Sequence, residues 1–304
     1  MRQIGLLATV AVGLGFGASP GSVTAYVVPA PGARYQLHLE PLVTPPNQTV
    51  GLFLRVRVNG GPPLRLLLDS GAQCVVLDRK AAARSGCAGG TDLELVEAGA
   101  RSPVTARRLR ARTVELGALA FHDAPILVLD QSLGNGIQGA LPLSLFAEFL
   151  IRLDIPSKTL ELTPYPAEGT DTGEAVSALS TNHLLFLKGT YNETHDGYFL
   201  LDTGASYNAI SRKVARQLNL SDGLAPLVPV RGGSTDLDAP LLNDLFRIRL
   251  GSHEITEKSL VVIDLSVSSR YHKVEISGLL GYPALRDSVL FVNYRDRLVR
   301  ITPK

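Results

Sequence analysis

One short pattern occurs twice at a fixed distance, and it constrains the fold more than any other feature of the 304-residue chain. Residues 66–73 read LLLDSGAQ and residues 199–206 read FLLDTGAS, 133 positions later. The same offset aligns the flanking residues of 53–86 with those of 186–219. Self-similarity over such a distance indicates that one structural unit is repeated within the chain.

The repeat continues to the end of the chain with a slowly growing offset. Leu116 matches Leu250 at an offset of 134, and residues 137–146 (IQGALPLSLF) match residues 276–285 (ISGLLGYPAL) at 139. Loops between strands absorb insertions of this size. The whole chain after its N-terminal segment is therefore read as two copies of one lobe.

Each copy is predicted to be mainly β. Its apolar runs are short and are bounded by Gly, Pro, Asn or Asp, as is typical of strands. Asp78 and Ser211 precede RKAAAR and RKVARQ, and both are good helix N-cap residues, which predicts one short helix per lobe. A content of 45% hydrophobic and 19% charged residues is enough to fill a core and argues against disorder. The Pro-, Gly- and Thr-rich stretch 163–180 looks like a linker, which places the lobes at 26–166 and 167–304.

The first 25 residues differ from the rest of the chain. One positive charge is followed by an uncharged apolar run, and VTA at 23–25 has the small residues of a cleavage site. We read residues 1–25 as a signal peptide and expect an exported protein, periplasmic or extracellular, without stable membrane association after cleavage. The alternative is an uncleaved anchor, for which the run is short and glycine-rich. A net charge of +2 is too small to suggest a nucleic-acid partner.

Each repeated pattern carries an aspartate at the end of an apolar run. Burying an isolated carboxylate is costly, so Asp69 and Asp202 need an explanation. They could simply close strands with a turn, but turns do not explain apolar runs leading into both. A pseudo-twofold axis would place them face to face, where they share one proton. One can then act as a general base on a water and the other as a general acid, while the hydroxyls of Ser70 and Thr203 brace the opposite loop.

The two patterns, with IQGALPL and ISGLLGY downstream, resemble the two halves of an aspartic peptidase of the pepsin/retropepsin superfamily. The similarity extends over nearly all of residues 50–304 and is greatest to bacterial exported aspartyl proteases with two lobes in one chain. It implies two retropepsin-like β-barrel lobes related by a pseudo-twofold axis. It also implies an aspartic endopeptidase that hydrolyses extended peptides with a water activated between Asp69 and Asp202, as a monomer and without a cofactor.

The resemblance also assigns supporting residues. The active-site loops would be supported by Ser70, Gly71, Ala72, Thr203, Gly204 and Ala205. Gly139 and Gly278 would lie in a segment threaded behind each loop, and the flap candidates are Gly99, Gly232 and Gly233. The first lobe departs from the pattern, because it has Pro142 where the second lobe has Gly281.

The remaining expectations concern the cysteines and a second function. Cys74 and Cys87 are the only cysteines, and both lie in the first lobe of a chain expected to be exported, which favours a disulfide over two buried free thiols. Six scattered His and these two Cys show no ligand spacing, so no metal site is expected. A catalytically silent peptide-binding or inhibitor-type module on the same fold is the alternative function, since a fold does not imply activity.

Overall fold

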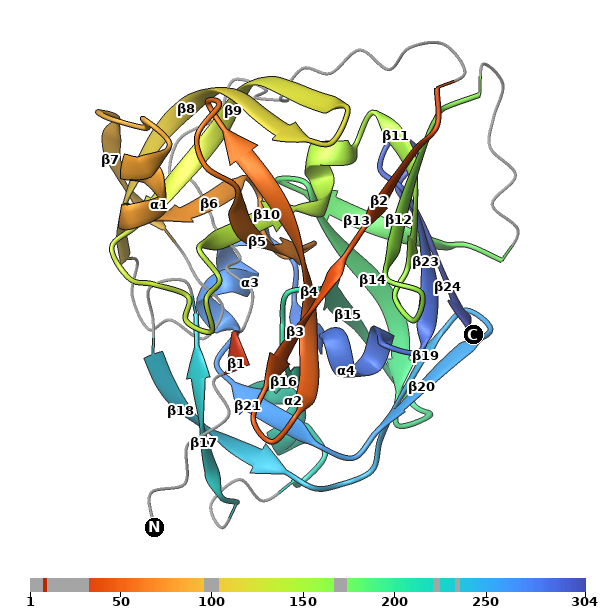
Figure 1. The fold of residues 1–304 in the computed structure, drawn as a ribbon. Helices are drawn as coiled ribbons and strands as arrows, with labels where there is room; N and C mark the ends of the chain where they lie inside the picture. Colours follow the sequence, from red (N-terminus) through yellow and green to blue (C-terminus); the bar gives the residue numbers. More distant parts are fainter. Residues whose placement is uncertain (1–7, 10–32, 96–103, 167–173, 221–224, 233–235) are drawn as a thin grey trace.

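The structure is a computed structural model and has two mainly β lobes joined by a shared sheet (Figure 1). It describes residues 8–9, 33–95, 104–166, 174–220, 225–232 and 236–304. The expected mainly β, two-lobed fold is confirmed, but the stretch 163–180 is not linker throughout, because it includes the end of β12 (Thr159–Pro164) and most of β13 (Val176–Thr181). Among the described residues, no helix has the length and apolar character needed to cross a bilayer.

The first lobe is an eight-stranded sheet closed into a barrel. Its strands are β3 (Glu40–Thr44), β4 (Gln48–Val58), β5 (Leu64–Asp69), β6 (Val75–Asp78), β7 (Thr91–Leu95), β8 (Val104–Leu116), β9 (Leu119–Leu129) and β10 (Gly139–Pro142), and its helices are α1 (Arg79–Arg84) and the 3-10 helix η1 (Leu143–Phe146). The strand order is β3-β4-β5-β10-β6-β9-β8-β7, and β4 also pairs with β8 to close the barrel.

The second lobe repeats these pairings. It contains β14 (Leu184–Tyr191), β15 (His195–Leu201), β16 (Asn208–Ser211), β17 (Leu227–Arg231), β18 (Asp236–Leu242), β19 (Phe246–Leu250), β20 (His253–Glu257), β21 (Leu260–Ile263) and β22 (Ile276–Leu280), with α2 (Arg212–Gln217), α3 (Ser266–His272) and α4 (Tyr282–Leu285). The long strand β8 of the first lobe corresponds to two strands here, β18 and β19, and β19 pairs with β14 as β8 pairs with β4. The short strand β1 (Ala8–Thr9) lies parallel to β17.

Each lobe has the short helix that the sequence predicts, and the second lobe has a further helix, α3, that the first lobe lacks. Asp78 accepts a hydrogen bond from the Ala81 backbone N–H at 2.7 Å, and Ser211 accepts one from that of Val214 at 3.2 Å, so both predicted N-caps are confirmed. Helix α3 has no helical counterpart in the first lobe, where the chain instead turns through Gly134 and Gly136 at positive φ. That inserted helix accounts for most of the growth in the repeat offset.

Six antiparallel strands join the lobes, along the right of Figure 1. Their order is β13 (Val176–Thr181), β24 (Leu298–Pro303), β23 (Ser288–Asn293), β11 (Phe149–Asp154), β12 (Thr159–Pro164) and β2 (Tyr35–His38). At the centre Ile151 pairs with Val292 and Leu153 with Leu290, and the repeat offset of 139 exchanges these two pairs. The pair between them, Arg152 and Phe291, therefore lies on the pseudo-twofold axis.

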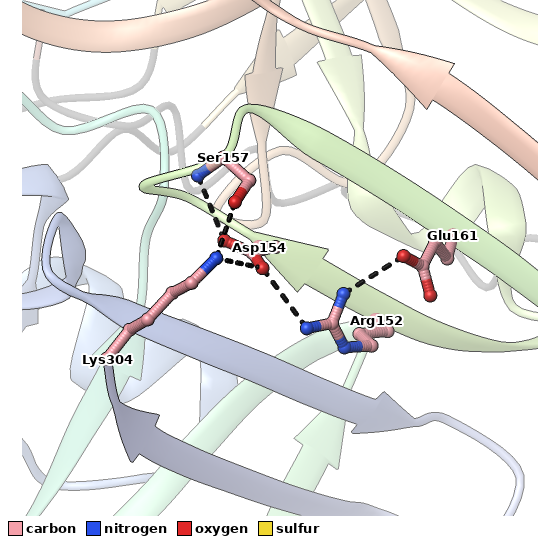
Figure 2. A network of polar contacts seen from close by, with 5 residues as sticks. All are labelled: Arg152, Asp154, Ser157, Glu161 and Lys304. Carbon is pink, nitrogen blue, oxygen red and sulfur yellow. Dashed lines mark hydrogen bonds and ion pairs between the residues drawn. The ribbon is translucent and has the colours of Figure 1, made fainter.

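One side of this sheet carries a polar network that ties the end of the second lobe to the first (Figure 2). The buried carboxylate of Asp154 accepts hydrogen bonds from Lys304 Nζ at 2.7 Å and from the Ser157 backbone N–H at 2.9 Å. Arg152 bridges Asp154, at 3.1 Å, and Glu161, at 3.0 Å. Burial alone would raise the pKa of Asp154, but the hydrogen bonds from Lys304 and Ser157 outweigh it and lower that pKa to about 2.

This network should stabilise the protein in a pH-dependent way. The folded pKa of Asp154 lies below the unfolded value, so its contribution is present above about pH 4, is lost as the pH falls toward 2, and amounts to about 2 kcal/mol. Lys304→Met should lower the free energy of unfolding at neutral pH and weaken that dependence. Lys188→Met is the matched control, because Lys188 pairs with Asp196 on the surface and such pairs contribute little. Urea unfolding at several pH values measures both, and equal losses for the two variants would contradict the prediction.

Candidate active site

The two repeated loops are positioned by a strand threaded between two others in each lobe. In the first lobe β10 lies parallel to β5 and antiparallel to β6, and in the second β22 lies parallel to β15 and antiparallel to β16. A Cβ on Gly139 would lie 1.9 Å from the Val76 carbonyl oxygen, and one on Gly278 would lie 2.3 Å from that of Ala209. Only glycine fits where these strands approach so closely.

A symmetric set of hydrogen bonds holds the two loops together. The hydroxyl of Thr203 donates to the Leu68 carbonyl at 2.9 Å and accepts from the Ser70 backbone N–H at 3.0 Å. The hydroxyl of Ser70 donates to the Leu201 carbonyl at 2.8 Å and accepts from the Thr203 backbone N–H at 3.0 Å. All four bonds are buried and all cross from one lobe to the other. The bracing predicted for these hydroxyls from the repeat is therefore present in the structure.

Removing either hydroxyl of the brace should lower the free energy of unfolding more than removing an ordinary surface hydrogen bond would. Thr203→Val keeps the shape but leaves the Ser70 N–H and the Leu68 carbonyl without their partner, which should cost about 2 kcal/mol of unfolding free energy. Ser70→Ala should cost a similar amount, because its hydroxyl makes the mirror-image pair of bonds. Chemical denaturation measures both, and a cost confined to one of the two variants would contradict a symmetric brace.

Both aspartates lie where the loops meet. Asp69 is 1% exposed and Asp202 is fully buried. The Gly71 backbone N–H donates to Asp69 Oδ1 at 2.8 Å, and the Ala205 N–H donates to Asp202 Oδ1 at 3.0 Å. The carboxyl of Asp69 rests against the opposite loop, because a Cβ on Gly204 would lie 2.5 Å from its carboxyl carbon. The structure thus brings together the predicted pair and all six predicted loop residues.

Burial dominates the electrostatics of this pair. It raises the pKa of Asp69 well above its usual range, and hydrogen bonds from the Gly71 and Ala72 N–H groups and from the Asp202 carboxyl offset this only in part. A raised pKa in a closely coupled pair favours the form in which one proton is shared. Such a pair can give and take a proton in the same step. Within the described residues, no cluster of three or more His, Cys, Asp or Glu side chains could hold a metal ion.

The difference between Pro142 and Gly281 has a structural explanation that the sequence reading missed. The Gly281 N–H donates to Asn208 Oδ1 at 2.8 Å, and this bond anchors the threaded strand of the second lobe. Pro142 has no N–H, and the residue equivalent to Asn208 in the first lobe is Val75, which offers no acceptor. The two departures from symmetry therefore compensate for each other, and comparing the repeats position by position could have revealed them.

The structure describes only part of each predicted flap. The hairpins β7–β8 and β17–β18 are both present as antiparallel pairs that extend to Leu95 opposite Val104 and to Arg231 opposite Asp236. Gly232 is buried directly after β17, whereas Gly99 and Gly233 lie outside the described residues. The roles of these hairpin tips stay predictions.

The predicted disulfide is wrong, because Cys74 and Cys87 are both free thiols. Cys74 is buried in a small cluster with Val76 and Leu127, whereas Cys87 packs against the main core of the protein. The Sγ atom of Cys87 accepts a hydrogen bond from Asn59 at 3.5 Å. The two thiols belong to different apolar clusters, and burial raises the pKa of Cys74 to about 12.

Comparison with known proteins agrees with this geometry. The family model described as aspartyl protease matches residues 54–145 and 187–284, which is more than half of the chain and one match per lobe. Among solved structures, an aspartic proteinase from Irpex lacteus is similar, with a TM-score of 0.53 and 12% sequence identity over 90% of this chain and 98% of that one. At that identity the likeness speaks for the fold alone. No curated protein matches the chain.

Proposed function

The chain belongs to the aspartyl protease family, and we propose that it is an aspartic endopeptidase that hydrolyses peptide bonds with a water held between Asp69 and Asp202. The observation that carries the proposal is the four-bond brace between the two loops, which packs the two carboxyls together out of solvent. A fold without catalytic use would gain nothing from burying two acidic groups side by side.

The proposed mechanism needs no group beyond this pair and a water. The carboxylate takes a proton from the water as its oxygen attacks the peptide carbonyl carbon, and the protonated partner gives its proton to the carbonyl oxygen. A neutral tetrahedral diol results. The pair then gives a proton to the amide nitrogen and takes one from a hydroxyl of the diol, the C–N bond breaks, and an amine and a carboxylic acid leave. The single shared proton is recovered at the end of the cycle.

We also propose that the substrate is an extended peptide and that the enzyme acts after export. The hairpins β7–β8 and β17–β18 occupy equivalent places in the two lobes and can offer backbone groups to an extended chain. The export proposal rests on the sequence of residues 1–25.

The proposal is tested by incubating the purified protein with a library of random peptides and sequencing the products. Cleavage at internal bonds, blocked by a peptide inhibitor containing the diol-mimicking statine unit, is the expected result. Tight binding of the same inhibitor without any cleavage would instead identify a silent peptide-binding module. If the protein neither cleaves peptides nor binds the inhibitor, both functions are overturned.

The pH dependence should reflect the donors available to the pair. The side chains of Ala72 and Ala205 cannot donate a hydrogen bond, so at these two positions only the backbone N–H groups can stabilise the charged form. We expect a bell-shaped profile of kcat/KM centred at about pH 5 to 6, whose limbs report the pair as a unit. Ala72→Ser and Ala205→Ser add a hydroxyl donor to the charged form, which lowers the pKa and should move the acid limb to lower pH. An acid limb unmoved in both variants would contradict this reasoning.

A further inference from the structure

The outer side of the six-stranded sheet carries a hollow of about 250 Å³ that the proposed hydrolysis does not use. It is formed by β11 and β12 of the first lobe and by β23 and β24 of the second. The pair Arg152 and Phe291, which lies on the pseudo-twofold axis, forms part of its wall. The hollow therefore spans the junction of the two lobes.

Its charged groups lie in one row across four strands. Glu161 pairs in register with Arg152, Arg152 with Phe291, and Phe291 with Arg300. The first arginine is neutralised, because Arg152 bonds to both Glu161 and Asp154. Arg300 differs: its guanidinium carbon lies 4.1 Å from the centre of the Phe291 ring, and no acidic side chain within the described part of the chain pairs with it.

Arg300 is also partly withdrawn from water. Its Nε atom is buried and has no hydrogen-bond partner among the residues that the structure describes. Desolvating a guanidinium without a counter-charge is unfavourable, and a bound anion would remove that cost. Carboxylates suit this position, because two oxygens match the planar donors of an arginine.

Much of the rest of the hollow is apolar. Leu150, Leu298 and Ala175 line it, and Thr163 and Asn293 add polar groups. Ile151 and Val292 also border it, but their side chains are buried in the main core. An apolar body is favoured here because burying each methylene group contributes about 0.8 kcal/mol. The site therefore combines one unneutralised cation with a largely apolar wall.

We propose that this hollow binds an aliphatic carboxylate, with the carboxylate on Arg300 and the hydrocarbon chain against Leu150 and Leu298. Such a ligand contacts strands from both lobes, so its binding stabilises the lobe junction. Ligands that bind only the folded state raise the melting temperature, and their stabilisation grows with the logarithm of the ratio of ligand concentration to Kd.

Octanoate is the probe, titrated by calorimetry into the complete protein. It should bind about tenfold more tightly than hexanoate, which lacks two methylenes, and more tightly than 1-octanol or octylamine, which lack the negative charge. Its binding should also raise the melting temperature. Absence of octanoate binding at millimolar concentration, or equal affinity for octanoate and 1-octanol, would overturn the proposal.

Variants locate the site. Arg300→Met should weaken octanoate binding at least tenfold and leave 1-octanol binding unchanged, whereas Arg300→Lys should retain part of the preference for the anion. Arg249→Met, at an exposed arginine on β19, is the matched control and should bind octanoate as the wild type does. Equal octanoate affinity for Arg300→Met and Arg249→Met would place the binding elsewhere and overturn the proposal. If Arg300→Met does not fold, the Arg300→Lys variant and the comparison of octanoate with 1-octanol decide in its place.

Discussion

Asp69→Asn should lower kcat/KM on a cleavable peptide by about a thousandfold or more, and Asp202→Asn should do the same, because each removes one half of a proton-sharing pair. Asparagine has nearly the shape of aspartate, so the loop geometry survives. What is lost is the ability to exchange a proton with the water or with the carbonyl oxygen. A loss confined to one of the two variants would contradict a shared mechanism.

The fold of these variants is expected to be intact or more stable. The braces made by Ser70 and Thr203 do not involve the aspartate side chains, and replacing a buried acid by an amide removes the cost of burying a charge. Asp244→Asn, at an exposed position, is the control for activity. Melting temperatures separate a catalytic loss from an unfolding loss. A variant that is both folded and fully active would remove Asp69 or Asp202 from the proposed mechanism.

Much of this site could be predicted because it is encoded twice. The fixed offset between LLLDSGAQ and FLLDTGAS implied a pseudo-twofold axis, and symmetry then required that what Ser70 does for one loop Thr203 does for the other. The same alignment identified the N-caps Asp78 and Ser211 and the crowded glycines Gly139 and Gly278. Because the chain is duplicated, a local pattern predicts contacts between residues that are distant in the sequence.

The failures occurred where only one copy carries the feature. Cys74 and Cys87 have no cysteine counterparts, and sequence spacing does not show which apolar cluster each side chain joins. Helix α3 is likewise present in one lobe alone, so the repeat showed that residues were added there but not that they form a helix. The hollow beside Arg300 depends on the register between hairpins of different lobes, which no local pattern encodes.

Helix α3 also carries the group from which we expect the second large effect. His272, its last residue, is buried, and its ring contacts those of Phe186 and Tyr271 at centroid distances of 5.5 and 4.9 Å. Neither ring nitrogen has a hydrogen-bond partner among the described residues. Burial lowers the pKa of His272 from its usual 6.5 to about 4, because a charged imidazolium would lose its hydration there.

The direction of the resulting effect follows from proton linkage. In the unfolded chain His272 takes up a proton near pH 6.5, whereas in the folded protein it does so only near pH 4. Its contribution to stability is therefore complete above about pH 6.5 and falls by about 3 kcal/mol as the pH drops to 4. Below that value both states are protonated, and no further loss occurs.

His272→Leu should remove this acid sensitivity, because leucine fills a similar volume and has no proton to bind. Relative to the wild type, the variant should gain about 3 kcal/mol of unfolding free energy between pH 7 and pH 4, measured by urea denaturation at each pH. His122→Gln, at an exposed histidine on β9, should follow the wild type. Parallel curves for His272→Leu and the wild type would contradict this prediction, because they would show that the ring takes up its proton over the same pH range in the folded and the unfolded state. If instead the wild type loses the expected stability, a peptidase with a mildly acidic optimum works at a pH where its folded state is already weakened, and His272 is the residue that weakens it.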